Sequence, residues 1–197
     1  ASIVGIYCNM LTRSSALRLI PAIKAIRARV VIGGPDPVNY TEEYLDRGGV
    51  GVVIGEAERT MEALVPHLGQ YGAVKMEHIA GIAYREDGRT VRTQPRPYLE
   101  DLDAQPFPDR GAIDLHQYLN AWRDRHGIGS VSLITARGCP YTCTWCSRPV
   151  YGTTHRRRSV TNVADEVELI ISEYAPEMLW YADDVFTIHR SWFFKYA

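Results

Sequence analysis

The sequence predicts an α/β protein whose first part is a doubly wound, Rossmann-like domain. Short, β-rich apolar runs alternate with stretches of helical periodicity, which favours a parallel sheet covered by helices. The runs end in glycines, at the strand ends where doubly wound proteins bind ligands. A proline-rich, acidic stretch near the middle of the chain then separates this domain from a second one. We therefore expect two α/β domains joined by a linker.

The expected parallel strands of the first domain are the apolar runs at residues 3–7, 30–32 and 50–54. Apolar residues three or four apart predict a helix after each strand, and Thr41 is the expected cap of the second helix. Pro21 interrupts the first helical pattern and is expected to start or kink that helix. The expected buried helix positions are Leu17, Leu19, Ile20, Ile23, Ile26, Met61, Leu64, Val65 and Leu68.

A hairpin and a linker follow. Residues 81–85 and 90–92 flank an Asp-Gly pair, which is the signal of a tight turn between two strands. Residues 94–110 contain four prolines and four acidic residues, a composition typical of a linker. We place the first domain at 1–93, the linker at 94–128 and the second domain at 129–197.

The second domain opens with an apolar strand at residues 130–135, and a loop with three cysteines follows directly. Ser159 or Thr161 can cap the next helix. A further strand at 178–182 ends in two aspartates, and another helix is expected from His189. The apolar stripe expected on the first of these helices is Val163, Val167, Ile170 and Ile171.

Composition and charge limit the function. With 22 Lys and Arg against 23 Asp and Glu, nothing indicates binding to nucleic acid or to a membrane surface. Three of the four cysteines are too close together for a secreted disulfide framework, and no signal peptide is visible, so we expect a soluble, cytoplasmic protein. Cys8 is expected to be a small buried residue. The chain enters a strand without an initiator Met, so we expect it to be a piece of a longer protein.

The three clustered cysteines, Cys139, Cys143 and Cys146, could converge on one metal centre. Zinc would normally take a fourth protein ligand, for which His155 is the nearest candidate. A four-iron cluster held by three thiolates keeps one iron free for an exogenous ligand. Spacing alone leaves a structural zinc site and a catalytic iron-sulfur site open.

The cysteine loop, Cys139-Pro-Tyr-Thr-Cys143-Thr-Trp145-Cys146, resembles the Cys-x3-Cys-x-aromatic-Cys loop of the radical S-adenosylmethionine (SAM) superfamily. Further motifs resemble its cobalamin-dependent branch, including that branch's cobalamin-binding domain and linker. These motifs are Gly33-Gly34-Pro35, Gly55-Glu56-Ala57-Glu58, Gly81-Ile-Ala-Tyr84, Phe107-Pro-Asp-Arg110, Arg137-Gly138, Arg158-Ser159 and Asp183-Asp184-Val-Phe186. The resemblance implies a cobalamin-binding domain, incomplete at its N-terminus, followed by the start of a TIM-type β/α barrel.

The resemblance also implies the cofactors. Cys139, Cys143 and Cys146 would hold a 4Fe-4S cluster whose fourth iron binds SAM, and reductive cleavage of SAM would release a 5'-deoxyadenosyl radical. Trp145 would pack against the cluster or the adenine, although an aromatic loop residue can be plain packing. An external electron donor of the flavodoxin or ferredoxin type and a small-molecule substrate would be the partners.

Three charged residues are implied as candidates for two SAM contacts. Asp183 or Asp184 would bind the SAM amino group, and the other aspartate would be structural. Arg158 would bind the SAM carboxylate, although a run of three arginines is more often a solvated face.

Cobalamin would be bound in the first domain, where the resemblance implies four residues: Gly33, Gly34, Gly55 and Glu56. Glycine lets the backbone approach a ligand, although the same residues also suit an ordinary turn between strand and helix. Asn9, Met10 and Thr12 are candidate wall residues. The sequence has no Asp-x-His-x-x-Gly motif, which in related cobalamin domains supplies a histidine ligand of the cobalt. Either the strand that carries this motif lies outside the given sequence, or the cobalt has no histidine ligand, and both alternatives stay open.

The function implied by the resemblance is a transferase reaction in which a cobalamin-bound methyl group is moved to a substrate carbon. A rearrangement or cyclisation remains open. The alternative is a non-enzymatic cobalamin-type binding or sensor module with a structural zinc appendage.

Overall fold

The computed structural model describes residues 2–147 and 150–197. Two compact units are present: the first unit comprises Ala1–Tyr98 with Trp145–Gly152, and the second comprises Leu99–Thr144 with Thr153–Ala197. Within the described residues, no helix is long and apolar enough to span a membrane.

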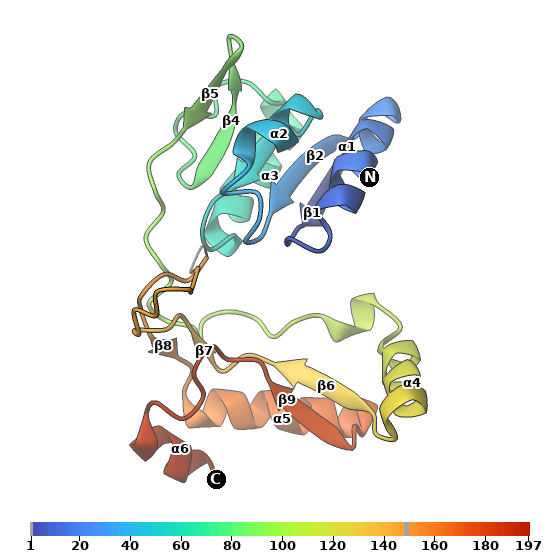
Figure 1. Ribbon diagram of the computed structural model, residues 1–197, viewed down its shortest axis with the longest axis vertical. Coiled ribbons are helices and arrows are strands. Elements are labelled where there is room, and N and C mark those ends of the chain that lie inside the picture. The colour runs from blue at the N-terminus through green and yellow to red at the C-terminus, as the bar shows by residue number, and fades with distance from the viewer. Residues whose placement is uncertain (1, 148–149) are drawn as a thin grey trace. The chain divides into compact units, whose positions relative to one another are not determined.

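The first unit contains a five-stranded sheet in the order β1-β2-β3-β4-β5 (Figure 1). Strands β1 (Ile3–Tyr7), β2 (Arg29–Gly33) and β3 (Gly51–Val53) are parallel, as predicted. Strands β4 (Ile82–Glu86) and β5 (Arg89–Arg92) run antiparallel to their neighbours. The predicted hairpin is confirmed, because the chain turns directly back at Asp87 and Gly88, both with positive φ, so that β4 and β5 pair antiparallel at one edge of the sheet.

Helices cover both faces of this sheet, as expected for a doubly wound domain. Helices α1 (Arg13–Ala25) and α2 (Thr41–Asp46) pack on the face that presents Val30 and Ile32. Helix α3 (Glu58–Tyr71) packs on the face that presents Val31 and Val53. Successive residues of a strand point to opposite faces, so the continuous apolar run in β2 supplies both cores.

Some local expectations for the helices are wrong. Helix α1 begins at Arg13, so Pro21 lies inside it and does not start it. Thr41 does not cap α2, because its hydroxyl donates to Pro37 O at 3.0 Å. Leu19, Val65 and Ile171 are exposed rather than buried, since the packed stripe of each helix is narrower than its apolar pattern. Ile26 is also exposed, because it follows the last residue of α1.

The second unit contains two parallel strands, β6 (Ser130–Leu133) and β9 (Met178–Tyr181), with α5 (Val160–Tyr174) between them in sequence (Figure 1). Ser159 caps α5 by accepting a hydrogen bond from Asn162 N, as predicted. The core is formed by Leu119, Val131, Leu133, Val163 and Ile170. Two paired strands do not make a barrel, so the barrel remains an expectation.

Helix α4 (Leu115–His126) lies within residues expected to be linker. Asp114 accepts a hydrogen bond from Gln117 N, and Gly127 ends the helix with a positive φ. These are ordinary helix start and stop signals that the sequence contained. The remaining elements of this unit are the 3-10 turn Arg110–Ala112, β7 (Ala136–Arg137), β8 (Arg156–Arg157) and α6 (Arg190–Tyr196).

An exposed ion pair ties the starts of β6 and β9 together. Glu177 accepts two hydrogen bonds from Arg123, at 2.8 and 2.9 Å, and one from Gly129 N at 2.7 Å. These partners, Arg123 first, lower the pKa of Glu177 from 4.5 to about 2. The carboxylate therefore contributes stability above pH 4.5, and this contribution is lost as the pH falls toward about 2.

We accordingly expect the Glu177→Gln variant to be less stable than the wild type near neutral pH, with the difference shrinking below pH 4.5. Urea unfolding monitored by tryptophan fluorescence over a pH series measures this difference in the free energy of unfolding. A difference that stays constant down to about pH 2 would show that the carboxylate charge is not involved.

Candidate functional site

The cysteine loop is closed at its neck by a short antiparallel ribbon. Strand β7 pairs with β8, which places Ala136 opposite Arg157 and Arg137 opposite Arg156. Gly138 has φ +83°, and a Cβ there would lie 2.2 Å from Thr154 O. Only glycine fits so close an approach, so this residue is required where the loop begins. The three cysteines therefore lie in a loop whose two ends are held together.

The cysteines of this loop are free thiols. Cys139 and Cys146 are partly exposed and Cys143 is exposed, whereas Cys8 is fully buried, as predicted. Trp145 is 86% exposed, so it is not a core packing residue in this structure. Among residues 2–147 and 150–197, no group of three or more His, Cys, Asp or Glu side chains is arranged to hold a metal ion. The thiols are thus accessible but not assembled into a metal site.

Asp183 anchors the entrance to this loop. Its carboxylate is fully buried and accepts hydrogen bonds from Thr135 N at 2.6 Å, from the Thr135 hydroxyl and from Ala136 N at 3.1 Å. Arg157 forms an ion pair with it at 3.5 Å. Since the side chain is buried and fully engaged, Asp183 holds the end of β6 against the end of β9. Of the two aspartates, Asp184 is exposed.

Arg157 is a structural residue rather than part of a solvated face. Its side chain is 5% exposed, and it donates to Val185 O at 3.1 Å and Phe186 O at 2.7 Å. Its guanidinium lies 4.3 Å from the centre of the Trp192 ring. Burial lowers the pKa of Arg157, and Asp183 opposes that effect. Arg157 thus fixes the loop that follows β9.

The predicted fourth zinc ligand, His155, lies in the same region. Its Nε2 atom is 3.4 Å from Val185 O, and its ring is 4.9 Å from that of His189. Burial, together with Arg157 and His189, lowers the pKa of His155. The lowered pKa favours the neutral imidazole, but no zinc site is assembled around it within the described residues.

Arg158, the predicted SAM contact, is paired inside the protein. Its guanidinium forms an ion pair with Glu166 and donates to Asn162 Oδ1 at 2.6 Å. Arg110 binds the same carboxylate at 2.6 Å. The prediction that Arg158 binds SAM stays a prediction, and the alternative of a solvated face is wrong because the side chain is only 11% exposed.

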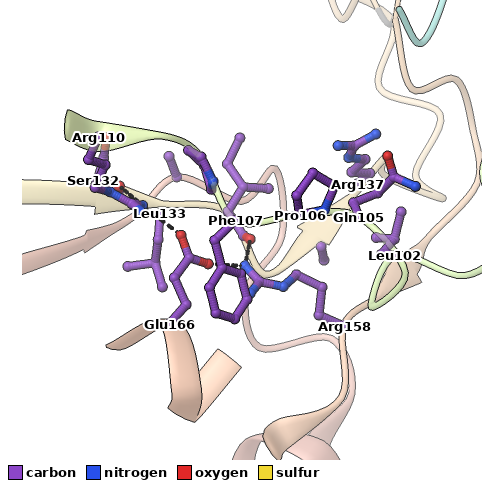
Figure 2. Close-up of a pocket in the computed structure, with 14 residues that line it drawn as sticks. Leu102, Gln105, Pro106, Phe107, Arg110, Ser132, Leu133, Arg137, Arg158 and Glu166 are labelled. Carbon is purple, nitrogen blue, oxygen red and sulfur yellow. Dashed lines mark hydrogen bonds and ion pairs between the residues drawn. The ribbon is translucent and has the colours of Figure 1, made fainter. Parts of the chain in front are cut away.

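Glu166 was not singled out from the sequence, although a signal was present. It lies between Val163 and Ile170 on the buried stripe of α5, where a carboxylate is unusual. Its side chain is 1% exposed. Glu166 lines a cavity of about 400 Å³ together with Phe107, Arg110 and Arg158. Figure 2 shows how these side chains lie around it.

The predicted ligand edge of the first unit is formed by the carboxyl ends of β1, β2 and β3. Gly34 has φ +109°, and a Cβ there would lie 2.3 Å from Cys8 O. The packing of the protein backbone therefore requires glycine at this position, whether or not a ligand binds nearby. At Gly33 a Cβ would make only ordinary contact with Val53. Gly55 has φ +80° and open space around it. Glu56 is buried and engaged by other parts of the chain.

Exposed apolar side chains lie at this edge. Tyr7, Met10 and Leu11, at the end of β1 and in the loop after it, are 72%, 79% and 86% exposed. The Asn9 side chain accepts hydrogen bonds from Leu11 N and Thr12 N, so it shapes this loop. Of the predicted wall residues, Met10 is accessible and Asn9 is structural. The exposure of Tyr7 and Leu11 was not predicted, because exposure cannot be read from local sequence.

A buried polar network lies beneath the same loop. The Tyr44 hydroxyl donates to Asp36 at 2.6 Å and lies 2.9 Å from Cys8 Sγ. Arg13 forms an ion pair with Asp36 at 2.9 Å and stacks on Tyr40. Burial, followed by the hydrogen bond to Asp36, raises the pKa of Tyr44. This network links the first turn of α1 to the loop after β2.

Comparison with known proteins gives consistent results, although no family model matches the chain. An uncharacterized methyltransferase of Pyrococcus horikoshii is 30% identical over 194 residues, 95% of this chain and 40% of that protein. The anaerobic magnesium-protoporphyrin IX monomethyl ester cyclase of Rubrivivax gelatinosus is 33% identical over 149 residues, 74% of this chain and 26% of that protein. The cytidylyl-2-hydroxyethylphosphonate methyltransferase of Streptomyces wedmorensis is 28% identical over 212 residues. The chain therefore spans less than half of these relatives.

Two solved structures share the fold. The radical SAM methyltransferase TsrM from Kitasatospora setae, solved with tryptophan and a SAM analogue, superposes with a TM-score of 0.75 at 19% identity, covering 96% of this chain and 38% of TsrM. The cobalamin-dependent SAM radical enzyme OxsB, solved with aqua-cobalamin, also gives 0.75, at 22% identity, covering 94% of this chain and 26% of OxsB.

Proposed function

Since the chain is a distant homologue of the B12-binding radical SAM enzymes, we propose that it belongs to a cobalamin-dependent radical SAM enzyme and carries both its cobalamin-binding region and its cluster loop. The observation that carries the proposal is the closed loop with three free, accessible thiols at the end of β6. Some relatives are named as methyltransferases and others as cyclases, so methyl transfer and cyclisation are the two candidate reactions.

The donor set of the loop fits an iron-sulfur cluster. Thiolates are the usual ligands of a four-iron cluster, and three of them leave one iron free for another ligand. The three cysteines lie in a loop without helix or strand, which can wrap around a cluster. Cys139, Cys143 and Cys146 would hold the 4Fe-4S cluster, which when bound supplies the electron for reductive cleavage of SAM. The pairing of β7 with β8 and the close approach of Gly138 to Thr154 would position the three thiols relative to the end of β6.

The residues around the loop would bind and orient SAM. Asp184 would accept hydrogen bonds from the SAM amino group, and its exposure at the end of β9 supports this role. Asp183 and Arg157 would act indirectly, because they fix the two strand ends between which SAM would lie. Trp145 would cover the adenine or the cluster, for which its exposed ring is available.

The carboxyl edge of the first unit would hold cobalamin. Tyr7, Met10 and Leu11 offer apolar surface for the flat corrin ring, and the open space at Gly55 lets the backbone approach it. Gly33, Gly34 and Glu56 would border the site. The buried network of Arg13, Asp36, Tyr44 and Cys8 would hold the loop after β1 in place, as its hydrogen bonds indicate.

We infer that the complete enzyme transfers a methyl group from cobalamin to a carbon atom of a small-molecule substrate. Cyclisation is the second candidate, because relatives named as cyclases match a large part of this chain. An external flavodoxin- or ferredoxin-type protein would supply the electron.

Anaerobic reconstitution with iron and sulfide, in the presence of cobalamin, tests this function. We expect the protein to bind roughly four irons per chain, to retain cobalamin through gel filtration, and to cleave SAM when reduced. Stoichiometric zinc with no SAM cleavage would instead identify the non-enzymatic zinc-stabilised module. A variant with Leu11→Asp should lose cobalamin but keep its iron, which separates the two cofactor sites.

A further inference from the structure

His67, near the C-terminal end of α3, has its tautomer fixed by the backbone. The residue is 9% exposed, and its Nε2 atom lies 2.8 Å from Val74 O. A carbonyl oxygen only accepts hydrogen bonds, so Nε2 carries the hydrogen in this contact. In the neutral ring, Nδ1 then carries the lone pair. The hydrogen bond to Val74 therefore makes Nδ1 the atom of His67 that can bind a ligand.

The protein does not use this lone pair. Within the described residues, Nδ1 of His67 has no hydrogen-bond partner. Unlike Nδ1 of His155, which is fully buried, it borders solvent. A small ligand can therefore reach Nδ1 although most of the His67 side chain is covered.

A second imidazole lies next to the first. His78 is exposed, and its ring centroid is 5.1 Å from that of His67, at an interplanar angle of 61°. His78 belongs to a turn in which Ile79 N donates to Met76 O at 3.0 Å. Met76 and Ile79 are buried in the same core as the apolar residues of α3. These two anchors fix the turn, so the backbone of His78 is held beside His67.

The spacing of the two rings suits a shared metal ion. Zn²⁺ binds imidazole nitrogen at about 2.0–2.1 Å in tetrahedral geometry, which separates the centroids of two bound rings by roughly 5 Å. A metal-binding histidine usually donates its other ring N–H to a carbonyl or carboxylate group, as His67 does to Val74 O. The exposed His78 ring has no hydrogen bond within the part of the chain that the structure describes, so it is free to turn a nitrogen toward the ion.

We propose that His67 and His78 bind one divalent transition-metal ion of the zinc class at the surface of the first unit. The ligands are Nδ1 of His67 and one ring nitrogen of His78. Water completes the coordination, since no third His, Cys, Asp or Glu joins the pair among residues 2–147 and 150–197. The ion links α3 to the turn that precedes β4 (Figure 1). This site does not rest on the proposed function and does not involve the loop cysteines.

Isothermal titration calorimetry with Zn²⁺ tests the proposal. The three loop cysteines are changed to alanine for this experiment, because their thiols would also bind zinc. We expect roughly one Zn²⁺ per chain in this protein. His78→Ala should weaken Zn²⁺ binding at least about tenfold, because it removes one of two ligands. The matched control is His126→Ala, which removes another exposed histidine in contact with an aromatic ring and should change the affinity less than about twofold.

A second variant tests the buried ligand. His67→Gln keeps an N–H group that can donate to Val74 O but has no nitrogen lone pair, so it should retain the fold and weaken Zn²⁺ binding at least about tenfold. Zn²⁺ should raise the free energy of unfolding of the protein with both histidines, and should raise it less in either variant. Absence of Zn²⁺ binding, unchanged binding in His78→Ala, or equal weakening by His126→Ala would each overturn the proposal.

Discussion

Replacing Cys143 by alanine is expected to abolish SAM cleavage and to reduce the bound iron from roughly four per chain to fewer than about one. The remaining cysteine, Cys8, cannot replace a lost cluster ligand, because it is buried in the first unit and hydrogen-bonded to the Tyr44 hydroxyl. Since Cys143 is exposed, its loss should leave the folding stability unchanged. Iron analysis after anaerobic reconstitution and assay of 5'-deoxyadenosine measure the effect.

Cys8→Ser is the matched control for this prediction. It also removes one thiol, but from the buried network with Tyr44 and Asp36, so it should lower the stability and leave the iron content at roughly four. If Cys143→Ala kept its iron and its SAM cleavage, the assignment of the loop as the cluster site would be wrong. If both variants lost iron equally, the loss would reflect folding rather than ligation.

Replacing Asp183 by alanine is expected to destabilise the second unit by about 3–5 kcal/mol, the typical cost of removing one partner of a buried ion pair. The change leaves the Arg157 guanidinium buried, with its carboxylate partner gone. It also removes the acceptor for Thr135 N and Ala136 N, which fix the start of the cysteine loop. Chemical unfolding followed by tryptophan fluorescence reports on this, because Trp192 packs on Arg157.

The neighbouring aspartate provides the control. Asp184→Ala should change the stability by less than about 0.5 kcal/mol, because the side chain is exposed. The same variant should weaken SAM binding if Asp184 contacts the SAM amino group. Equal destabilisation by the two substitutions would contradict the division of roles between a structural and a ligand-binding aspartate.

Most secondary structure followed from the sequence because its causes are local. The apolar runs of β1 and β2, the Asp87-Gly88 turn and the Ser159 cap act through neighbouring residues, so spacing and residue type sufficed. The spacing of the three cysteines also indicated a metal loop, and that stays a prediction. The missed helix α4 had its own local signals in Asp114 and Gly127, which the expectation of a linker concealed.

The roles of the charged residues were decided by tertiary structure. The sequence presents Asp183 and Asp184 as equivalent, but only Asp183 is buried against Thr135, which is 48 residues away in sequence. Arg110 and Arg158 come from distant motifs, and they meet because Glu166 lies buried between them. Local residue patterns determined the elements and the cysteine loop. Burial and charge pairing between distant segments determined which charged groups hold the fold and which are left available for ligands.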